Sequence, residues 1–137
     1  MSATGTIHRD FESLHAKFQV IAETWLHICK DDLSVEMRVL ETLRDRERQK
    51  DLESRGKSKV KVGWHNVGLA LDFACFDERG VYDTDNHSGL YTKCGLVAEA
   101  MGCVWGGRWR MRDYGHIEWH EGFTLQQFLN GSKEGVI

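Results

Sequence analysis

The chain has 137 residues, of which 41% are hydrophobic and 28% are charged, with five tryptophans and no proline. This length and composition predict one folded domain over residues 1–137 and exclude a disordered chain. A formal net charge of -3 gives no general attraction to nucleic acid, and no apolar stretch is long enough to cross a membrane. We therefore expect no nucleic-acid partner, no membrane insertion and a monomer.

The cysteines and the N-terminus indicate the compartment of synthesis. Four cysteines lie far apart without a C-x-x-C pair: Cys29, Cys75, Cys94 and Cys103. This spacing favours buried, reduced thiols over a disulfide framework. Residues 1–8 lack the basic and apolar regions of an export signal, so we expect synthesis in the cytoplasm without a signal peptide. Residues 1–9 are expected to form a loosely ordered arm.

The first half of the chain shows a helix, a strand and a second helix. Apolar side chains at helical spacing predict a helix over residues 11–29, with Asp10 as its N-cap. Period-two alternation then predicts a strand from Val35 to about Arg44. The next helix follows directly, with Asp45 as its N-cap and Gly56 at its end.

The second half continues the mixed pattern. Residues 69–76 are expected to form a strand and residues 88–101 a helix that ends at Gly102. In a further strand, His116, Glu118 and His120 alternate with apolar residues, which predicts one polar face and one buried face.

A last short helix begins with a capping box formed by Thr124 and Gln127, with Phe123 packed on Phe128 and Gly131 as its stop. The alternation of helices and strands predicts an α+β fold. We expect a small, mostly antiparallel sheet with helices packed on one face.

The strand over residues 69–76 carries an acid in an apolar setting. Asp72 lies between Leu71 and Phe73, and burying its carboxylate is costly unless a cation or strong donors meet it. Strand alternation places Asp72 on the opposite face from these two neighbours, and Gly68 allows His65 to fold back over that face. Two histidines and one aspartate, supplied by this run and by the later Asp113–His116 run, suit a zinc site with an open position.

The same residues carry a family resemblance. Residues 63–73 resemble the pattern S-x-H-x-x-G-x-A-x-D, and residues 113–118 resemble D/E-x-x-H-x-E. Between them, residues 105–109 are similar to a W-G-G-x-W segment, and residues 44–52 match R-x-x-x-x-Q-x-x-L. Four ordered blocks over roughly residues 10–120 are far more specific than one. The chain resembles the zinc D-alanyl-D-alanine carboxypeptidases and L-alanyl-D-glutamate endopeptidases that cut peptidoglycan.

The resemblance implies a fold and a set of residue roles. The implied fold is that of the Hedgehog and D-Ala-D-Ala peptidase group. One Zn²⁺ per chain is implied, with these ligands: His65, Asp72 and His116. Asp113 is implied as the catalytic acid-base group, and Arg44 as a group that binds substrate or the developing oxyanion. Gly63 stands where the family has a serine, so a hydroxyl near the metal is missing.

For several neighbouring residues the sequence leaves two alternative roles open. Glu118 is expected to orient a zinc histidine through its second nitrogen or to be a solvated carboxylate. His120 is the rival ligand, because it shares a strand face with His116. Trp105 and Trp109 are expected either to wall a substrate cleft or to belong to the core.

Two further residues complete the candidates. Gln49, in the matched R-x-x-x-x-Q-x-x-L block, is a substrate-binding candidate. His87 is expected in a loop or at a rim.

Together these features predict a zinc metallopeptidase that hydrolyses an amide in the peptidoglycan stem peptide. Similarity of the W-G-G-x-W block to the endolysin branch favours cleavage between L-Ala and D-Glu. The alternatives are a carboxypeptidase for terminal D-Ala-D-Ala and, from another class, a non-catalytic binding module with structural zinc. The implied site of action is the bacterial cell wall, reached after phage-type release.

Overall fold

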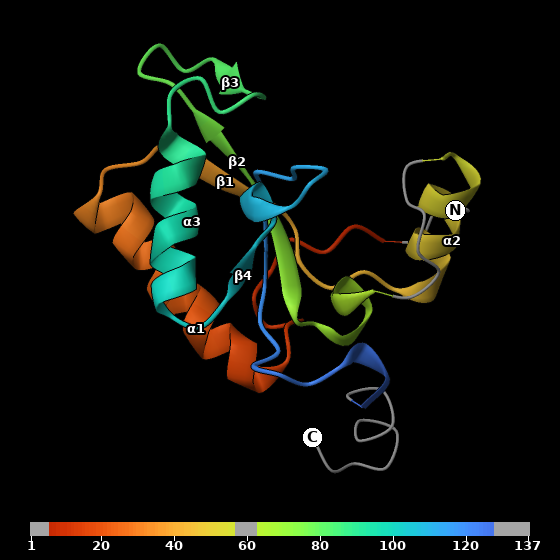
Figure 1. Cartoon of the computed structure of the whole chain (residues 1–137). Coiled ribbons are helices and arrows are strands. Elements are labelled where there is room, and N and C mark those ends of the chain that lie inside the picture. The colour runs from red at the N-terminus through yellow and green to blue at the C-terminus, as the bar shows by residue number, and fades with distance from the viewer. Residues whose placement is uncertain (1–5, 57–62, 128–137) are drawn as a thin grey trace.

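A computed structural model describes residues 6–56 and 63–127 of the chain (Figure 1). Its regular elements, in chain order, are α1 (Ala16–His27), a π-helical turn (Ile28–Asp32), β1 (Met37–Glu41), α2 (Arg46–Ser54), a 3-10 turn (Trp64–Val67), β2 (Ala70–Phe76), β3 (Tyr82–Asp83), α3 (Leu90–Ala100), β4 (Val104–Trp105), a second 3-10 turn (Gly106–Arg108) and β5 (His116–Glu118). None of the helices in these two ranges has the length and apolar character that a membrane crossing requires.

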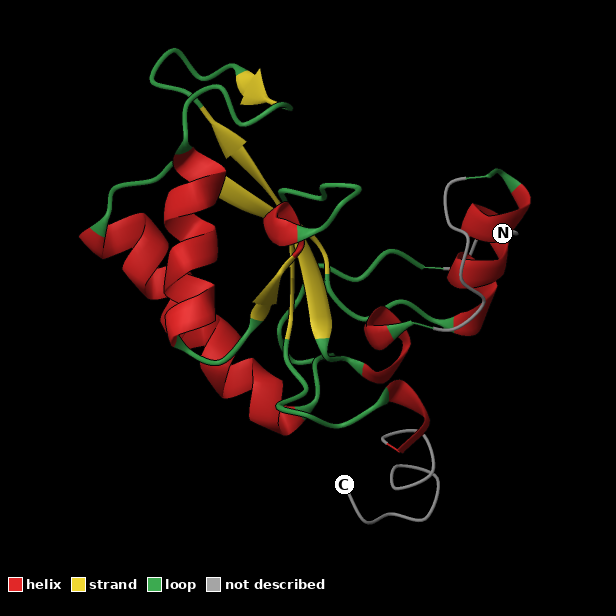
Figure 2. Cartoon of the chain, in the orientation of Figure 1, coloured by secondary structure: helices red, strands yellow, loops and turns green. Residues whose placement is uncertain are grey.

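The strands form one antiparallel sheet in the order β1-β2-β5-β4, with β3 paired to the far end of β2. Helices α1 and α3 lie together against one face of this sheet, whereas α2 lies apart from them, across the sheet (Figure 2). The predicted α+β fold with a small antiparallel sheet is confirmed. The helices α1 and α3 follow the expected one-face packing, and α2 does not.

The apolar core lies between the sheet and the two packed helices. On β2, Leu71, Phe73 and Cys75 are buried on this side. The Phe73 ring contacts the rings of Trp25 and Tyr91, with centroids 5.0 and 5.5 Å apart. All four cysteines are also buried, and burial raises the pKa of Cys103 to about 12, so its thiol stays protonated.

The helix starts test the predicted caps. α1 begins at Ala16 and not at residue 11, because Asp10 closes a separate turn in which its Oδ2 accepts from the Ser13 N–H at 2.8 Å. Asp45 is the N-cap of α2 as predicted, since its side chain accepts from the Arg48 N–H at 2.8 Å. Gly56 follows α2 in the left-handed conformation.

Strand β1 is shorter than predicted and ends in a bulge. Val39 pairs with Phe73, but Glu41 pairs with Asp72, so one extra residue is inserted between them. A bulge of this kind reverses the side-chain alternation. The predicted strand to Arg44 is therefore wrong at its end, and Glu41 lies buried on the same side of the sheet as Asp72.

The N-terminal segment is more ordered than expected. The Thr42 N–H donates to the His8 carbonyl at 2.7 Å, and Ile7 forms an antiparallel bridge with Arg44. Residues 6–9 thus run beside the end of β1, and the predicted loose arm is wrong for them. Residues 1–5 lie outside the described residues.

The last part of the chain shows the predicted capping box. Thr124 N–H donates to Gln127 Oε1 at 2.9 Å, and Gln127 N–H donates to Thr124 Oγ1 at 3.1 Å. The expected Phe128 contact and the stop at Gly131 lie outside the described residues. Strands β3 and β4, each of two residues, were not predicted.

Candidate active site

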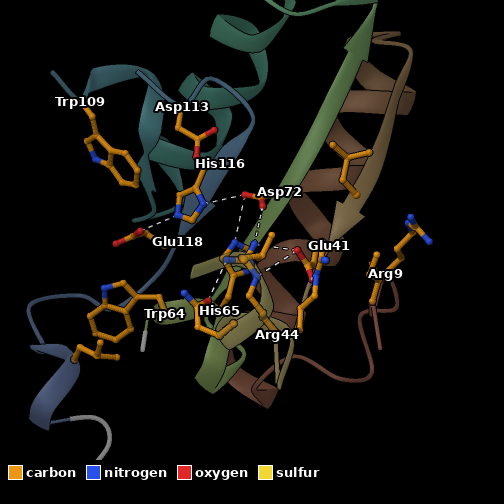
Figure 3. Close-up of a pocket in the computed structure, with 17 residues that line it drawn as sticks. Arg9, Glu41, Arg44, Trp64, His65, Asp72, Trp109, Asp113, His116 and Glu118 are labelled. Carbon is orange, nitrogen blue, oxygen red and sulfur yellow. Dashed lines mark hydrogen bonds and ion pairs between the residues drawn. The ribbon is translucent and has the colours of Figure 1, made fainter. Parts of the chain in front are cut away.

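A cleft of about 770 Å³ opens on the face of the sheet opposite to the α1 and α3 core (Figure 3). Its lining includes every residue of the expected ligand set, together with Asp113 and Arg44. The two sequence motifs, far apart along the chain, therefore meet in one cavity.

The three expected ligands come from three neighbouring elements. His65 lies on the 3-10 turn before β2, whereas Asp72 on β2 and His116 on β5 are direct cross-strand partners. Gly68 ends the turn with φ +72°, and a Cβ atom there would lie 2.7 Å from the His15 backbone nitrogen. Only glycine permits this close return.

The donor atoms of these residues converge. His65 Nε2 lies 3.3 Å from Asp72 Oδ1, and His116 Nδ1 lies 3.0 Å from the same oxygen. One donor atom from each residue fits within 4.8 Å of the other two. Two imidazole nitrogens and one carboxylate oxygen form the donor set that zinc prefers in catalytic sites.

The tautomer of His65 gives further evidence that these residues fit a metal ion. His65 Nδ1 lies 2.8 Å from the Thr42 carbonyl oxygen, which can only accept, so Nδ1 carries the proton. In the neutral ring, Nε2 then turns a lone pair toward the Asp72 carboxylate, and it makes no hydrogen bond although it is buried. Two acceptors at this distance repel each other unless a cation or a proton lies between them. The residues present therefore fit a metal ion.

His116 lies between two carboxylates. Its Nδ1 faces Asp72, and its Nε2 lies 2.8 Å from Glu118 Oε1. Burial lowers the pKa of His116, but the two carboxylates outweigh it and raise this pKa to about 10. Asp72 shows the converse balance, since burial raises its pKa while His65 and His116 hold it well below the usual range.

Glu118 shares its two oxygens between two histidines. Oε1 meets His116, and Oε2 lies 2.8 Å from His120 Nε2. The geometry fits the expected orienting role of Glu118. His120 instead stacks on Trp64, with ring centroids 4.3 Å apart, and lies outside the group of three converging donors. The structure therefore disfavours His120 as a rival ligand.

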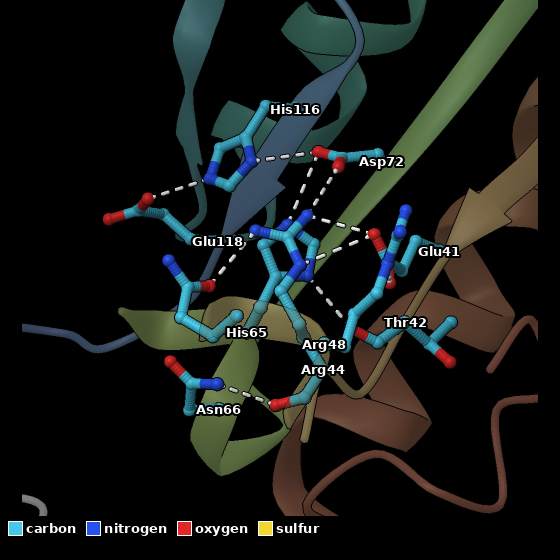
Figure 4. A network of polar contacts seen from close by, with 10 residues as sticks. Glu41, Thr42, Arg44, Arg48, His65, Asn66, Asp72, His116 and Glu118 are labelled. Atoms are coloured by element: carbon cyan, nitrogen blue, oxygen red, sulfur yellow. Dashed lines mark hydrogen bonds and ion pairs between the residues drawn. The ribbon is translucent and has the colours of Figure 1, made fainter. Parts of the chain in front are cut away.

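Arg44 is held by acids and by an amide (Figure 4). Its Nη2 donates to Glu41 Oε1 at 2.9 Å and to Asp72 Oδ2 at 3.4 Å, while Nη1 donates to Gln49 Oε1 at 3.3 Å. Gln49 is only 1% exposed. This contact gives Gln49 a role in placing Arg44. Gln49 also lines the cleft, so its predicted substrate contact stays a prediction.

Glu41 and Arg48 are site residues that the sequence analysis missed. Glu41 is 6% exposed, and its Oε2 accepts from Arg48 Nε at 3.1 Å. The only signal in the sequence was an acid within an alternating strand, and the bulge that turns Glu41 toward the cleft leaves no mark in that pattern.

Asp113 lies at the cleft beside His116 (Figure 3). Its backbone N–H donates to the Gly106 carbonyl at 3.0 Å, and a Cβ atom at residue 106 would lie 2.4 Å from the Asp113 carbonyl oxygen. Gly106 therefore allows the loop to bring Asp113 to the cleft. Desolvation and then the negative charge of Asp72 raise the pKa of Asp113.

The two tryptophans of the W-G-G-x-W segment have different environments. The Trp105 ring is buried where a Cβ atom at Gly95 or Gly107 would lie only 2.2 Å from it, and its Nε1 donates to the Tyr114 carbonyl at 2.7 Å. Trp105 is not among the residues that line the cleft, so of its two predicted roles the structure supports the core and not the cleft wall. Trp109 does line it, 37% exposed, with its ring centroid 5.0 Å from that of His116.

Two residues at the ends of the cleft also escaped the sequence analysis. Trp64 lines the cleft next to His65, and its position beside that histidine was the only signal. Arg9 lines it from the N-terminal segment. His87 lies on an exposed turn before α3, where it faces Asp85 at 3.5 Å, which confirms its expected loop position.

The His-Asp-His donor group and the further acid Asp113 share one cleft of an α+β domain, an arrangement that is typical of metal-dependent peptidases. Part of the chain matches a known family. Residues 56–119 match the family described as D-alanyl-D-alanine carboxypeptidase, a range that contains all three donors and Asp113. This part of the chain thus matches the peptidase family, and the resemblance seen in the sequence is confirmed.

Two curated proteins that are similar to this chain are named as peptidases. The chain is 29% identical over 104 residues to the L-alanyl-D-glutamate peptidase of Listeria phage A118, covering 72% of this chain and 36% of the relative. It is 30% identical over 101 residues to the peptidoglycan L-alanyl-D-glutamate endopeptidase CwlK of Bacillus subtilis, covering 61% and 60%. The chain therefore spans about a third and three fifths of these two relatives.

A solved structure confirms the fold. The crystal structure of the Serratia marcescens L-Ala D-Glu endopeptidase ChiX superposes with a TM-score of 0.63 at 21% identity, covering 85% of this chain and 88% of the other. At this identity the likeness establishes the shared fold.

Proposed function

We propose that this chain is a zinc-dependent peptidase that hydrolyses the amide between L-alanine and D-glutamate in the peptidoglycan stem peptide. The observation that carries the proposal is the convergence of His65, Asp72 and His116 in one cleft that Asp113 also lines. The names of the phage relative and of CwlK support this choice of bond.

The proposed chemistry needs an electrophile and a proton carrier. When bound by His65, Asp72 and His116, zinc supplies a Lewis acid that polarises a carbonyl and makes water more acidic. Asp113 lines the cleft without belonging to the donor group, so its carboxylate is free to take the proton of the attacking water. It then returns that proton to the leaving amine.

Arg44 has a positioning role in this proposal. It contacts Asp72 through Oδ2, whereas both histidines face Oδ1. The guanidinium thus fixes the carboxylate plane and leaves Oδ1 directed at the two imidazoles. Glu41 and Gln49 hold Arg44 in turn.

Cleavage of terminal D-Ala-D-Ala is the second candidate, because the matched family is described by that activity. A non-catalytic binding module is less consistent with the cleft. The Asp113 carboxylate has a raised pKa, which is the property of a proton carrier, and Gly106 is required to bring its backbone there.

The experiment is incubation of zinc-loaded protein with a stem pentapeptide, followed by mass spectrometry of the fragments. The expected products are a fragment that ends in L-Ala and one that begins with D-Glu. Release of free D-alanine would instead assign the carboxypeptidase activity. Intact peptide in the presence of stoichiometric zinc would overturn the peptidase proposal in favour of a binding module. We expect the active species to be a monomer that reaches the cell wall after phage-type release.

A further inference from the structure

The cleft has two unlike ends. Trp64 and Trp109 lie at one end, Arg9 lies at the other, and the three proposed ligands lie between them (Figure 3). A substrate that crosses the ligand group therefore meets aromatic rings on one side and a cation on the other.

The backbone that carries Arg9 is fixed to the sheet. His8 accepts from the Thr42 N–H at 2.7 Å, and Ile7 bridges to Arg44. These contacts hold the backbone just before Arg9 against the end of β1. The side chain of Arg9 therefore extends from a defined position at the cleft wall.

Arg9 differs from the other cleft arginines in its partners. Arg44 and Arg48 share the buried Glu41, at 2.9 and 3.1 Å. Over residues 6–56 and 63–127, Arg9 has no ion pair, and its side chain is exposed. Glu41 lines the same cleft, but it already pairs with the guanidinium groups of Arg44 and Arg48. It therefore leaves the positive charge of Arg9 uncompensated at this end.

We propose that Arg9 is a specificity-determining residue that binds a free carboxylate on the acidic residue following the scissile amide. This inference rests on the proposed L-alanyl-D-glutamate peptidase function. Glutamate has two carboxyl groups and only one can continue the peptide chain, so the other remains an anion close to the cleaved bond. A guanidinium matches a carboxylate in geometry and charge. The alanine side of the substrate then lies toward Trp64 and Trp109.

The test compares two peptides that differ in one group. Both contain L-Ala-D-Glu-L-Lys, and in the second the free glutamate carboxylate is converted to the primary amide. Wild-type protein loaded with zinc is expected to prefer the acid peptide in kcat/KM by about fivefold, the scale of a solvent-exposed ion pair. Arg9→Gln should lower kcat/KM for the acid peptide by that factor and leave the amide peptide unchanged, whereas Arg9→Lys should restore part of the preference.

Arg79→Gln is the matched control, since Arg79 is an exposed arginine on the turn before β3, outside the cleft. It should keep the wild-type preference. An unchanged preference in Arg9→Gln would overturn the assignment of Arg9.

A binding measurement separates this inference from the proposed function. In the zinc-loaded Asp113→Asn background, Arg9→Gln should weaken binding of the acid peptide about fivefold and not that of the amide peptide. If the wild type cleaves neither peptide, the proposed function fails while this binding result still decides the role of Arg9. Equal binding of both peptides with and without Arg9 would exclude it.

Discussion

The two faces of strand β2 have very different surroundings. Leu71, Phe73 and Cys75 point into the core beneath α1 and α3, and each is at most 2% exposed. Asp72 points the other way, into a cleft with two histidines and an arginine. Adjacent residues on one strand thus serve stability and chemistry separately.

This contrast teaches how the site is kept rigid. The core face anchors β2 through ring contacts to Trp25 and Tyr91, and the backbone pairing with β5 transmits that position to His116. The polar side chains of the cleft can keep their relative positions because the opposite face of the same strand is well packed.

The largest expected effect is a loss of catalytic rate with no change in zinc content or stability. Asp113→Asn should lower the rate of stem-peptide cleavage by about two to four decades, because a positioned acid-base group contributes that much. Zinc content and the thermal unfolding midpoint should stay at wild-type values, since Asp113 is outside the donor group. Rate measurement with metal analysis checks this, and a fully active variant would remove Asp113 from its role.

The next largest effect is expected for a substitution on the core-facing side of β2. Phe73→Ala should lower the free energy of unfolding by about 3–5 kcal/mol, because it removes a buried ring between Trp25 and Tyr91. Urea unfolding measures the loss. Phe76→Ala, on the same strand but only partly buried, is the control and should cost about 1–2 kcal/mol. Equal losses at the two positions would contradict the anchoring role given to the core face.

A third change tests the metal directly. Zinc at about 100 times its Kd should stabilise the wild type by about 2.7 kcal/mol, because only the folded state assembles the donors. His65→Ala should lose most of this gain, and thermal unfolding with and without zinc measures it. His87→Ala removes an exposed histidine and should behave as the wild type. Stoichiometric zinc in His65→Ala would exclude His65 as a ligand.

The cleft face could be predicted from sequence only in part. Strand alternation placed Asp72 opposite to Leu71 and Phe73, and the two motifs named the three donors, because both signals are local. Glu41 could not be placed, since the bulge before it depends on pairing with β2.

Other features depended on tertiary contacts for a similar reason. The sequence left Trp105 open between the cleft wall and the core, and the core placement depends on Gly95, distant in sequence, which leaves room for its ring in the interior. The Ile7–Arg44 bridge and the two-residue strands β3 and β4 likewise exist only through pairing with other segments.

The smallest expected effect concerns a carboxylate at the far end of β2, where Asp83 on β3 pairs with Cys75. Asp83 is buried and accepts from the backbone N–H groups of His87 and Ser88, at 3.0 and 2.9 Å, at the turn before α3. Burial raises its pKa, but the hydrogen bond from the Ser88 hydroxyl, together with these backbone bonds, outweighs burial and lowers the pKa overall. In contrast to Asp72, this acid has its charge satisfied by donors of the fold itself.

Asp83→Asn should therefore cost about 1–2 kcal/mol of folding free energy at pH 7, measured by urea unfolding. Because the folded-state pKa of Asp83 lies below its unfolded value, its contribution is complete above the unfolded pKa and disappears as the pH falls through the folded pKa. The difference between variant and wild type should thus shrink in acid. Asp85→Asn, a largely exposed neighbour, should change stability by less than about 0.5 kcal/mol at any pH. A loss in Asp83→Asn that does not depend on pH would show that the carboxylate charge is not what stabilises this turn.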